Sequence, residues 1–105
     1  MNNKLVFNQA KGKFVVTMKE GDAEPVETEN KEELVGEGKL LEADEVVRVT
    51  VGLEAKFGLP NYSSAGCSVS ISIPCSAGEE DDAFGAGKDW CEEKMGELAK
   101  GITSG

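Results

Sequence analysis

Apolar and polar residues alternate along two long segments in the middle of the chain. From Val47 to Leu59 every odd-numbered position is apolar, and the even positions are polar, charged or glycine. From Cys67 to Cys75 the odd positions are again apolar, and serines fill most of the even ones. Since side chains of a β-strand point to alternate faces, both segments predict half-buried strands. The Gly-, Pro-, Asn- and Ser-rich stretch between them predicts the turn of a hairpin.

This hairpin has an internally consistent register. Pairing Phe57 with Val69 and Leu53 with Ile73 puts both apolar sets on one side. The other side then carries the polar side chains of both strands: Arg48, Thr50, Glu54, Lys56, Ser68, Ser70 and Ser72. We expect that polar side to face water or a partner.

The N-terminal part of the chain predicts a second hairpin. Residues 4–9 and 13–19 are both rich in β-branched and aromatic residues, and the turn-like Ala10-Lys11-Gly12 separates them. Residues 20–45 are acidic and contain several glycines and a proline, which predicts an acidic loop or a partly ordered insertion. Inside it, Asn30 stands three positions before Glu33, a capping pattern that would favour a short helix.

A helix is predicted at the C-terminal end. Four acids, Glu79 to Asp82, stand where a helix N-terminus favours negative charge. After them small and apolar residues recur at steps of three and four: Phe84, Gly87, Cys91, Met95, Leu98 and Ile102. The predicted fold is therefore α+β: one domain over residues 1–105, an antiparallel sheet of about four strands in two hairpins, and one C-terminal helix on one face.

The negative charge is concentrated in one quarter of the chain. The net charge is −9, and the stretch from Glu20 to Glu45 holds eleven acids and two lysines, a balance of −9. Such a segment repels phosphates and anionic lipid headgroups and attracts a basic protein surface. We therefore predict partner-binding carboxylates in this segment: Glu24, Glu27, Glu29, Glu32, Glu33 and Glu37.

The sequence contains no recognisable catalytic or metal-binding motif. It has no histidine, which removes the usual general base and the commonest metal ligand. Its three cysteines have spacings of eight and sixteen that match no zinc site, and we expect them to be buried free thiols. The stretch Gly85-Ala86-Gly87-Lys88 lacks the other residues of a phosphate-binding loop. We predict neither an enzyme nor a bound cofactor or metal.

Two aromatic residues are ambiguous. Trp90 lies beside the predicted helical stripe, and it fits either the rim of the core or an anchor in a protein interface. Tyr62 is placed in the hairpin turn, where it would cover the open end of the hairpin or stack on a nucleic-acid base.

The stretch from Val46 to Leu98 combines a long alternating strand, a turn containing Asn61-Tyr62-Ser63, a strand ending in Pro74-Cys75, and a helix with Trp90. This pattern resembles small, mostly uncharacterised proteins of bacteriophages and mobile elements. It covers about half of the chain, excludes the acidic segment, and transfers no catalytic residue. The resemblance implies a short accessory or host-interaction protein.

Our leading hypothesis is a non-enzymatic interaction protein that binds a basic surface of a host protein, for example as a phage-encoded inhibitor that mimics nucleic acid. The absence of an apolar run of about 20 residues and of a signal peptide favours the cytoplasm of the bacterial host cell, without membrane contact. One alternative is a single-stranded nucleic-acid-binding module that uses Tyr62 and the basic residues of the sheet, such as Lys56. Another is a virion component that forms a homo-oligomer through Trp90 and the hairpin edges.

Overall fold

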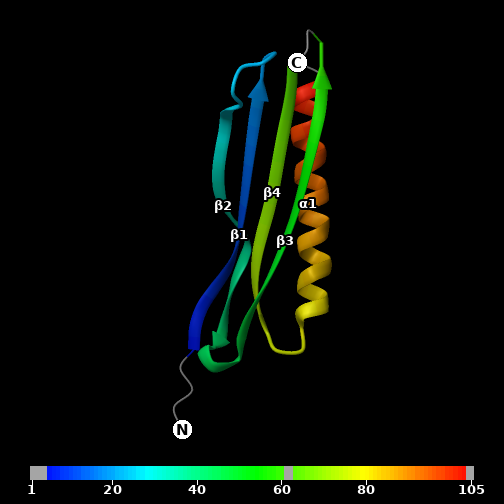
Figure 1. The fold of residues 1–105 in the computed structure, drawn as a ribbon. Coiled ribbons are helices and arrows are strands. Elements are labelled where there is room, and N and C mark those ends of the chain that lie inside the picture. The colour runs from blue at the N-terminus through cyan, green and yellow to red at the C-terminus, as the bar shows by residue number, and fades with distance from the viewer. Residues whose placement is uncertain (1–4, 61–62, 104–105) are drawn as a thin grey trace.

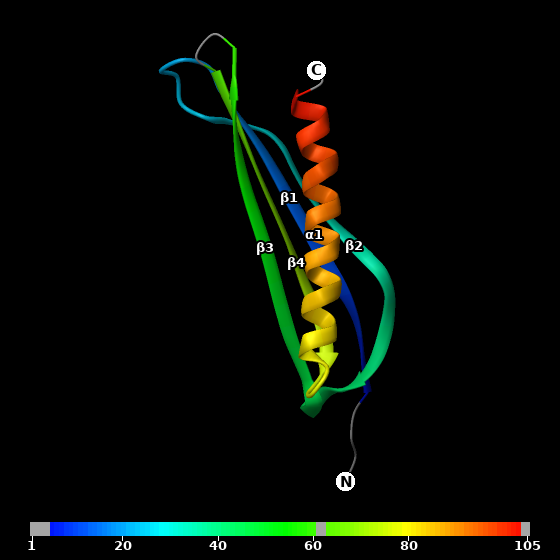
Figure 2. The same ribbon diagram turned by 90° about the vertical axis from the view of Figure 1, so that its right-hand side faces the viewer.

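The computed structural model describes residues 5–60 and 63–103, and it contains one antiparallel sheet and one helix (Figure 1). The strands are β1 (Leu5–Lys19), β2 (Val26–Glu42), β3 (Val46–Leu59) and β4 (Ser63–Ser76), with a 3₁₀ turn, η1 (Ala43–Glu45), between β2 and β3. The strand order is β2-β1-β4-β3. Helix α1 (Glu80–Thr103) packs on one side of the sheet, over β3 and β4 (Figure 2). The predicted α+β class is confirmed.

The hairpin of β3 and β4 has the predicted faces but a different register. Leu53 lies opposite Val69, and Phe57 lies opposite Ala65, whereas we predicted Ile73 and Val69 as their partners. The difference arises because β4 begins at Ser63, so that the Ser- and Gly-rich residues assigned to the turn extend the strand. A shift of an even number of residues leaves every side chain on its predicted face.

The predicted hairpin within residues 4–19 is wrong, because β1 runs through it as one strand of 15 residues. The turn-like residues Lys11 and Gly12 lie in the middle of β1. Gly12 is required there by packing, since a Cβ at this position would lie 2.5 Å from two ring atoms of Trp90. The glycine that suggested a turn therefore makes room for a side chain of α1.

The acidic segment is also different from the prediction. Instead of a loop or partly ordered insertion with a short helix, residues 26–42 form β2, which pairs with β1 along most of its length. The side chains of β2 are nearly all exposed, so apolar alternation could not reveal the strand. Its backbone pairing is interrupted between Asn8 and Ala10, where Gly36 adopts a positive φ of 69° on the opposite strand.

The core lies between α1 and the sheet. It is built from buried side chains of β1, β3, β4 and α1: Phe14, Val51, Val69, Ile71 and Cys91. Gly87 lets the helix approach closely, because a Cβ there would come within 2.9 Å of Val51 Cγ2. Phe84 was predicted on the buried stripe, but 53% of its surface is exposed, and Ala83 is buried in its place. The three cysteines are buried free thiols, as predicted.

Candidate functional site

A groove lies between the C-terminal part of α1 and the sheet, where β1, β2 and the end of β3 line it. Its apolar wall includes Val16 and Met18 of β1 and Leu98 and Ile102 of α1. Its volume is about 610 Å³, and two of its lining residues are carboxylates, Glu29 on β2 and Glu97 on α1. All the α1 residues that line it belong to the last two turns of the helix, and Figure 2 shows this end of α1 diverging from the neighbouring strand ends.

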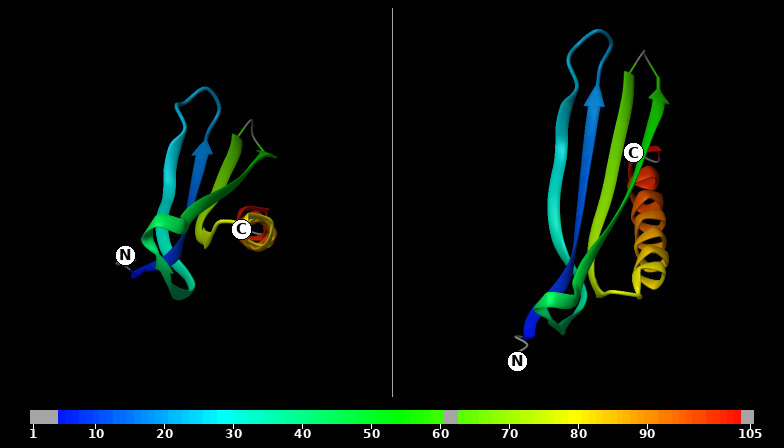
Figure 3. Two further views of the ribbon diagram at one scale, coloured as in Figure 1. Left: turned by 90° about the horizontal axis from the view of Figure 1, so that it is seen from below. Right: turned by 60° about the horizontal axis from the view of Figure 1, so that its bottom comes forward.

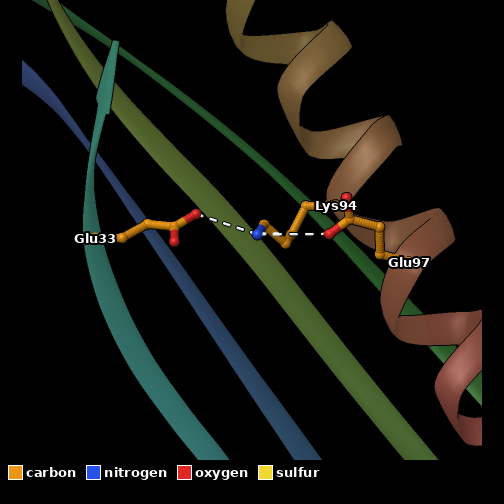
Figure 4. A network of polar contacts seen from close by, with 3 residues as sticks. All are labelled: Glu33, Lys94 and Glu97. Atoms are coloured by element: carbon orange, nitrogen blue, oxygen red, sulfur yellow. Dashed lines mark ion pairs between the residues drawn. The ribbon is translucent and has the colours of Figure 1, made fainter. Parts of the chain in front are cut away.

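Beside this groove, Lys94 of α1 forms an ion pair with Glu33 of β2 (Figure 4). Its Nζ lies 3.1 Å from Glu33 Oε1 on β2 and 3.6 Å from Glu97 Oε2 on α1. The same ammonium stands over two aromatic rings, 5.2 Å from the centroid of Phe14 and 5.6 Å from that of Trp90. This arrangement holds β2 against the helix and is a favourable cation–π geometry.

The electrostatics of Lys94 follow from these neighbours. Burial lowers the pKa of its ammonium, but the hydrogen bond and charge of Glu33, together with the charge of Glu97, outweigh burial and raise the pKa above its usual value. Lys94 is therefore fully charged at neutral pH. Beside it, Trp90, Glu93, Lys94 and Glu97 line a second hollow of about 240 Å³, which shares Glu97 with the groove.

Trp90 is partly buried at the boundary between α1 and β1. Its ring lies over Gly12 and below the ammonium of Lys94. This is the core-rim position that was one of the two alternatives for this residue. One part of the ring faces the hollow beside Lys94, so a role as an interface anchor stays a prediction.

The structure separates the carboxylates that were predicted as one partner-binding set. Glu29 and Glu33 lie opposite Val16 and Gly12 and therefore share the helix side of the sheet. Glu27 and Glu32 are paired with residues whose side chains point to the other side. Glu24 lies in the turn before β2, and Glu37 is exposed near the irregular part of that strand. Tyr62 lies outside the described residues.

The site contains acidic residues that the sequence analysis did not select. Glu93 and Glu97 were overlooked because they belong to the helix, outside the strongly acidic segment. Their spacing from Trp90, at three and seven residues, is a helical signal that could have placed them on the same face. Of these carboxylates, Glu97 is paired with Lys94, as Glu33 is.

Two kinds of chemical site are relevant to the described residues, cysteine nucleophiles and metal-ligand clusters. Burial raises the pKa of the thiols of Cys67, Cys75 and Cys91, so each is a poor nucleophile at neutral pH. Over residues 5–60 and 63–103, no three His, Cys, Asp or Glu side chains are placed to hold a metal ion. Within the same residues, no helix has the length and apolar character needed to cross a bilayer.

Comparison with known proteins adds no relative. No family model, no curated protein and no solved structure matches the chain. The resemblance to bacteriophage and mobile-element proteins therefore stays a prediction, and the functional argument rests on the geometry of the molecule.

Proposed function

We propose that the protein is a non-enzymatic interaction module that binds a basic segment of another protein in the groove between β2 and α1. The observation that carries this proposal is the combination of an apolar wall with exposed carboxylates at the edge of one groove. An interface needs both features, because apolar contact supplies most of the binding energy and charge selects the partner.

The groove defines the chemistry of the partner. Its apolar side chains, among them Met18 and Leu98, suit a partner residue such as Leu or Ile. Glu29, Glu93 and Glu97 are exposed and suit Lys or Arg at either side of that residue. The lysine that lies between them, Lys94, pairs with Glu33 and with Glu97, so Glu97 would be shared between Lys94 and the partner. An alternating or helical segment with both apolar and basic residues would satisfy these requirements.

The position of β2 at the edge of the sheet adds a second means of binding. Within the described residues β2 pairs only with β1, so the outer side of its backbone is available for pairing. Its carboxylates discourage pairing with β2 of a second copy, since like charges would meet, but they favour a basic strand. The basic partner could be a nucleic-acid-binding surface of a host protein, whose phosphate sites the carboxylates of β2 would occupy. This is the inhibitor hypothesis in its most specific form.

The test compares variants that differ only in the position of the lost charge. Tagged wild-type protein, Glu29→Gln/Glu97→Gln and the control Asp89→Asn/Asp82→Asn are used to recover partners from bacterial lysate after nuclease treatment, at low and moderate salt. Both double variants lose two charges from exposed positions. The recovered protein is then purified, and its affinity for each variant is measured.

We expect the groove variant to bind the purified partner at least tenfold more weakly, and the control variant to bind within about twofold of wild type, because each charged contact at an interface contributes about 1 kcal/mol or more. The partner should carry an excess of Lys and Arg at its contact surface. Equal affinity of the groove variant and wild type would refute the proposal.

A further inference from the structure

The side of the sheet that faces away from α1 carries every charged residue of β1, β3 and β4. The described residues place no element over this side, as the view along the helix shows (Figure 3). Its cations are Lys11, Lys13, Lys19, Arg48 and Lys56, and Glu54 is its only carboxylate from these three strands. The edge strand β2 adds Glu27, Glu32 and, at its far end, Glu42. In a chain with a net charge of −9, five of the eleven basic residues thus lie on one surface.

The centre of this surface is a trough along β4. On this side β4 has only small residues over most of its length: Ser64, Gly66, Ser68, Ser70 and Ser72. The longer side chains of β1 and β3 form its walls. Two hollows, of about 490 and 190 Å³, share Val15, Glu54 and Ser68 and therefore belong to one trough.

Cations stand at both ends of the trough. Towards one end Arg48 Nη1 donates a hydrogen bond of 3.1 Å to Ser72 Oγ, and Lys11 lies directly opposite Ser72 on β1. At the other end Lys56 lies opposite Gly66 and lines the smaller hollow. Since β1 and β3 flank β4, the walls are about 10 Å apart, which is room for one extended chain.

We propose that this trough binds the sugar–phosphate backbone of single-stranded nucleic acid. The charge of the cations and the hydroxyl groups of the serines complement phosphate and sugar oxygens. Between Lys11 and Lys19 on β1, and on the facing parts of β3 and β4, Val15 is the only apolar side chain on this side. A peptide would find a single apolar side chain there, and a base would find no aromatic ring. Binding should therefore depend on the backbone and show little sequence preference.

This proposal does not rest on the groove between β2 and α1, which lies on the opposite side of the sheet.

The expected salt dependence of nucleic-acid binding follows from the number of phosphates that the cations neutralise. Lys11 and Lys19 are about 27 Å apart along β1, and about four phosphates within that length would be neutralised. The logarithm of the affinity should then fall with a slope of about −3 against the logarithm of salt, which is about a twentyfold loss for a threefold rise in salt.

The test uses a fluorescein-labelled oligothymidylate and measures its anisotropy with wild-type protein, Lys56→Glu and the control Lys88→Glu. Both variants change the net charge equally, but Lys88 is exposed on α1, away from the trough. We expect Lys56→Glu to weaken binding at least tenfold and Lys88→Glu to change it by less than about twofold. Lys13→Gln provides a milder change of the same surface if Lys56→Glu fails to fold, as judged by circular dichroism.

Several results would overturn the proposal. One is the absence of oligonucleotide binding at low salt, and another is an equal loss of affinity in Lys56→Glu and Lys88→Glu. A third is competition by polyglutamate as strong as that by unlabelled oligonucleotide, which would identify an acidic peptide as the occupant. Concentration-dependent dimers in sedimentation that disappear in Lys56→Glu would identify a second copy of the chain instead. The groove variant Glu29→Gln/Glu97→Gln should retain oligonucleotide binding, which separates this proposal from the proposed function.

Discussion

At Gly87 α1 approaches the sheet closely, and replacement of this glycine by alanine tests that contact. A Cβ at this position would lie 2.9 Å from Val51 Cγ2, 3.2 Å from Ile71 Cγ2 and 3.3 Å from Ile73 Cδ1. Gly85 lies two residues earlier on the same helix, and a Cβ there would meet nothing within 4 Å. Gly85→Ala is therefore a matched control for Gly87→Ala.

The two substitutions share one contribution to the free energy of unfolding, that of helix propensity, and differ in another, that of core packing. Replacing glycine by alanine inside a helix stabilises it by about 1 kcal/mol at either position. At Gly87 the new methyl group also overpacks the core, which typically costs about 1–3 kcal/mol. Val51 cannot easily move away, because it is buried and its β-branched side chain is restricted at χ1. We expect Gly85→Ala to raise the free energy of unfolding by about 1 kcal/mol and Gly87→Ala to lower it by up to about 2 kcal/mol.

Urea unfolding and thermal melts followed by circular dichroism measure both effects. For a domain of this size, 1 kcal/mol corresponds to a change in Tm of about 4–8 °C. Gly85→Ala should melt above wild type, and Gly87→Ala at or below it. Equal stabilisation by both substitutions would refute the reasoning, because it would mean that the helix does not approach the sheet at Gly87.

Two further predictions concern Trp90 and the buried thiols. Gly12→Ala should displace the Trp90 ring, destabilise the protein by about 1–3 kcal/mol and shift the tryptophan fluorescence to the red. The control is Gly58→Ala, where a Cβ meets nothing within 4 Å and the emission should stay unchanged. An unshifted emission spectrum of Gly12→Ala would contradict the packing of Trp90 on Gly12. Burial raises the pKa of Cys67, Cys75 and Cys91 in the folded state, whereas unfolded thiols ionise near pH 8.5. The stabilisation from the neutral thiols is thus complete below about pH 8.5 and is lost as the pH rises through their folded pKa values. Urea unfolding should show lower stability at about pH 10 than at about pH 7, and Cys91→Ala should reduce that difference. Equal stability of the wild-type protein at both values of pH would contradict the prediction.

The elements that bury one face were predictable from sequence. The alternation in β3 and β4 reports which side chains meet the helix, and it is correct for both strands even though the register differs by four residues. The strand register depends on where the turn lies, and Ser63 to Gly66 suit a turn and a strand equally well by composition. The acidic β2 could not be predicted, because most of its side chains are exposed, its apolar residues do not alternate with polar ones, and it is held largely by backbone hydrogen bonds to β1.

The candidate site was predictable only in part. Acidic residues and Trp90 were selected from the sequence, and the structure brings Trp90 and Glu33 together through Lys94. The groove itself could not be inferred, because it exists between elements that are distant in the chain. Alternation along β2, once the strand is known, explains why Glu29 and Glu33 lie on the groove side while Glu32 lies on the other.

The most direct test of the proposed function is the affinity of the purified partner for the wild-type protein and for Glu29→Gln/Glu97→Gln, with Asp89→Asn/Asp82→Asn as the control of equal charge. The proposal predicts at least a tenfold loss for the groove variant, no significant loss for the control, and insensitivity of the wild-type complex to nuclease. Equal losses in both double variants, or a complex that nuclease removes, would contradict the claim that the groove between β2 and α1 binds a basic protein segment.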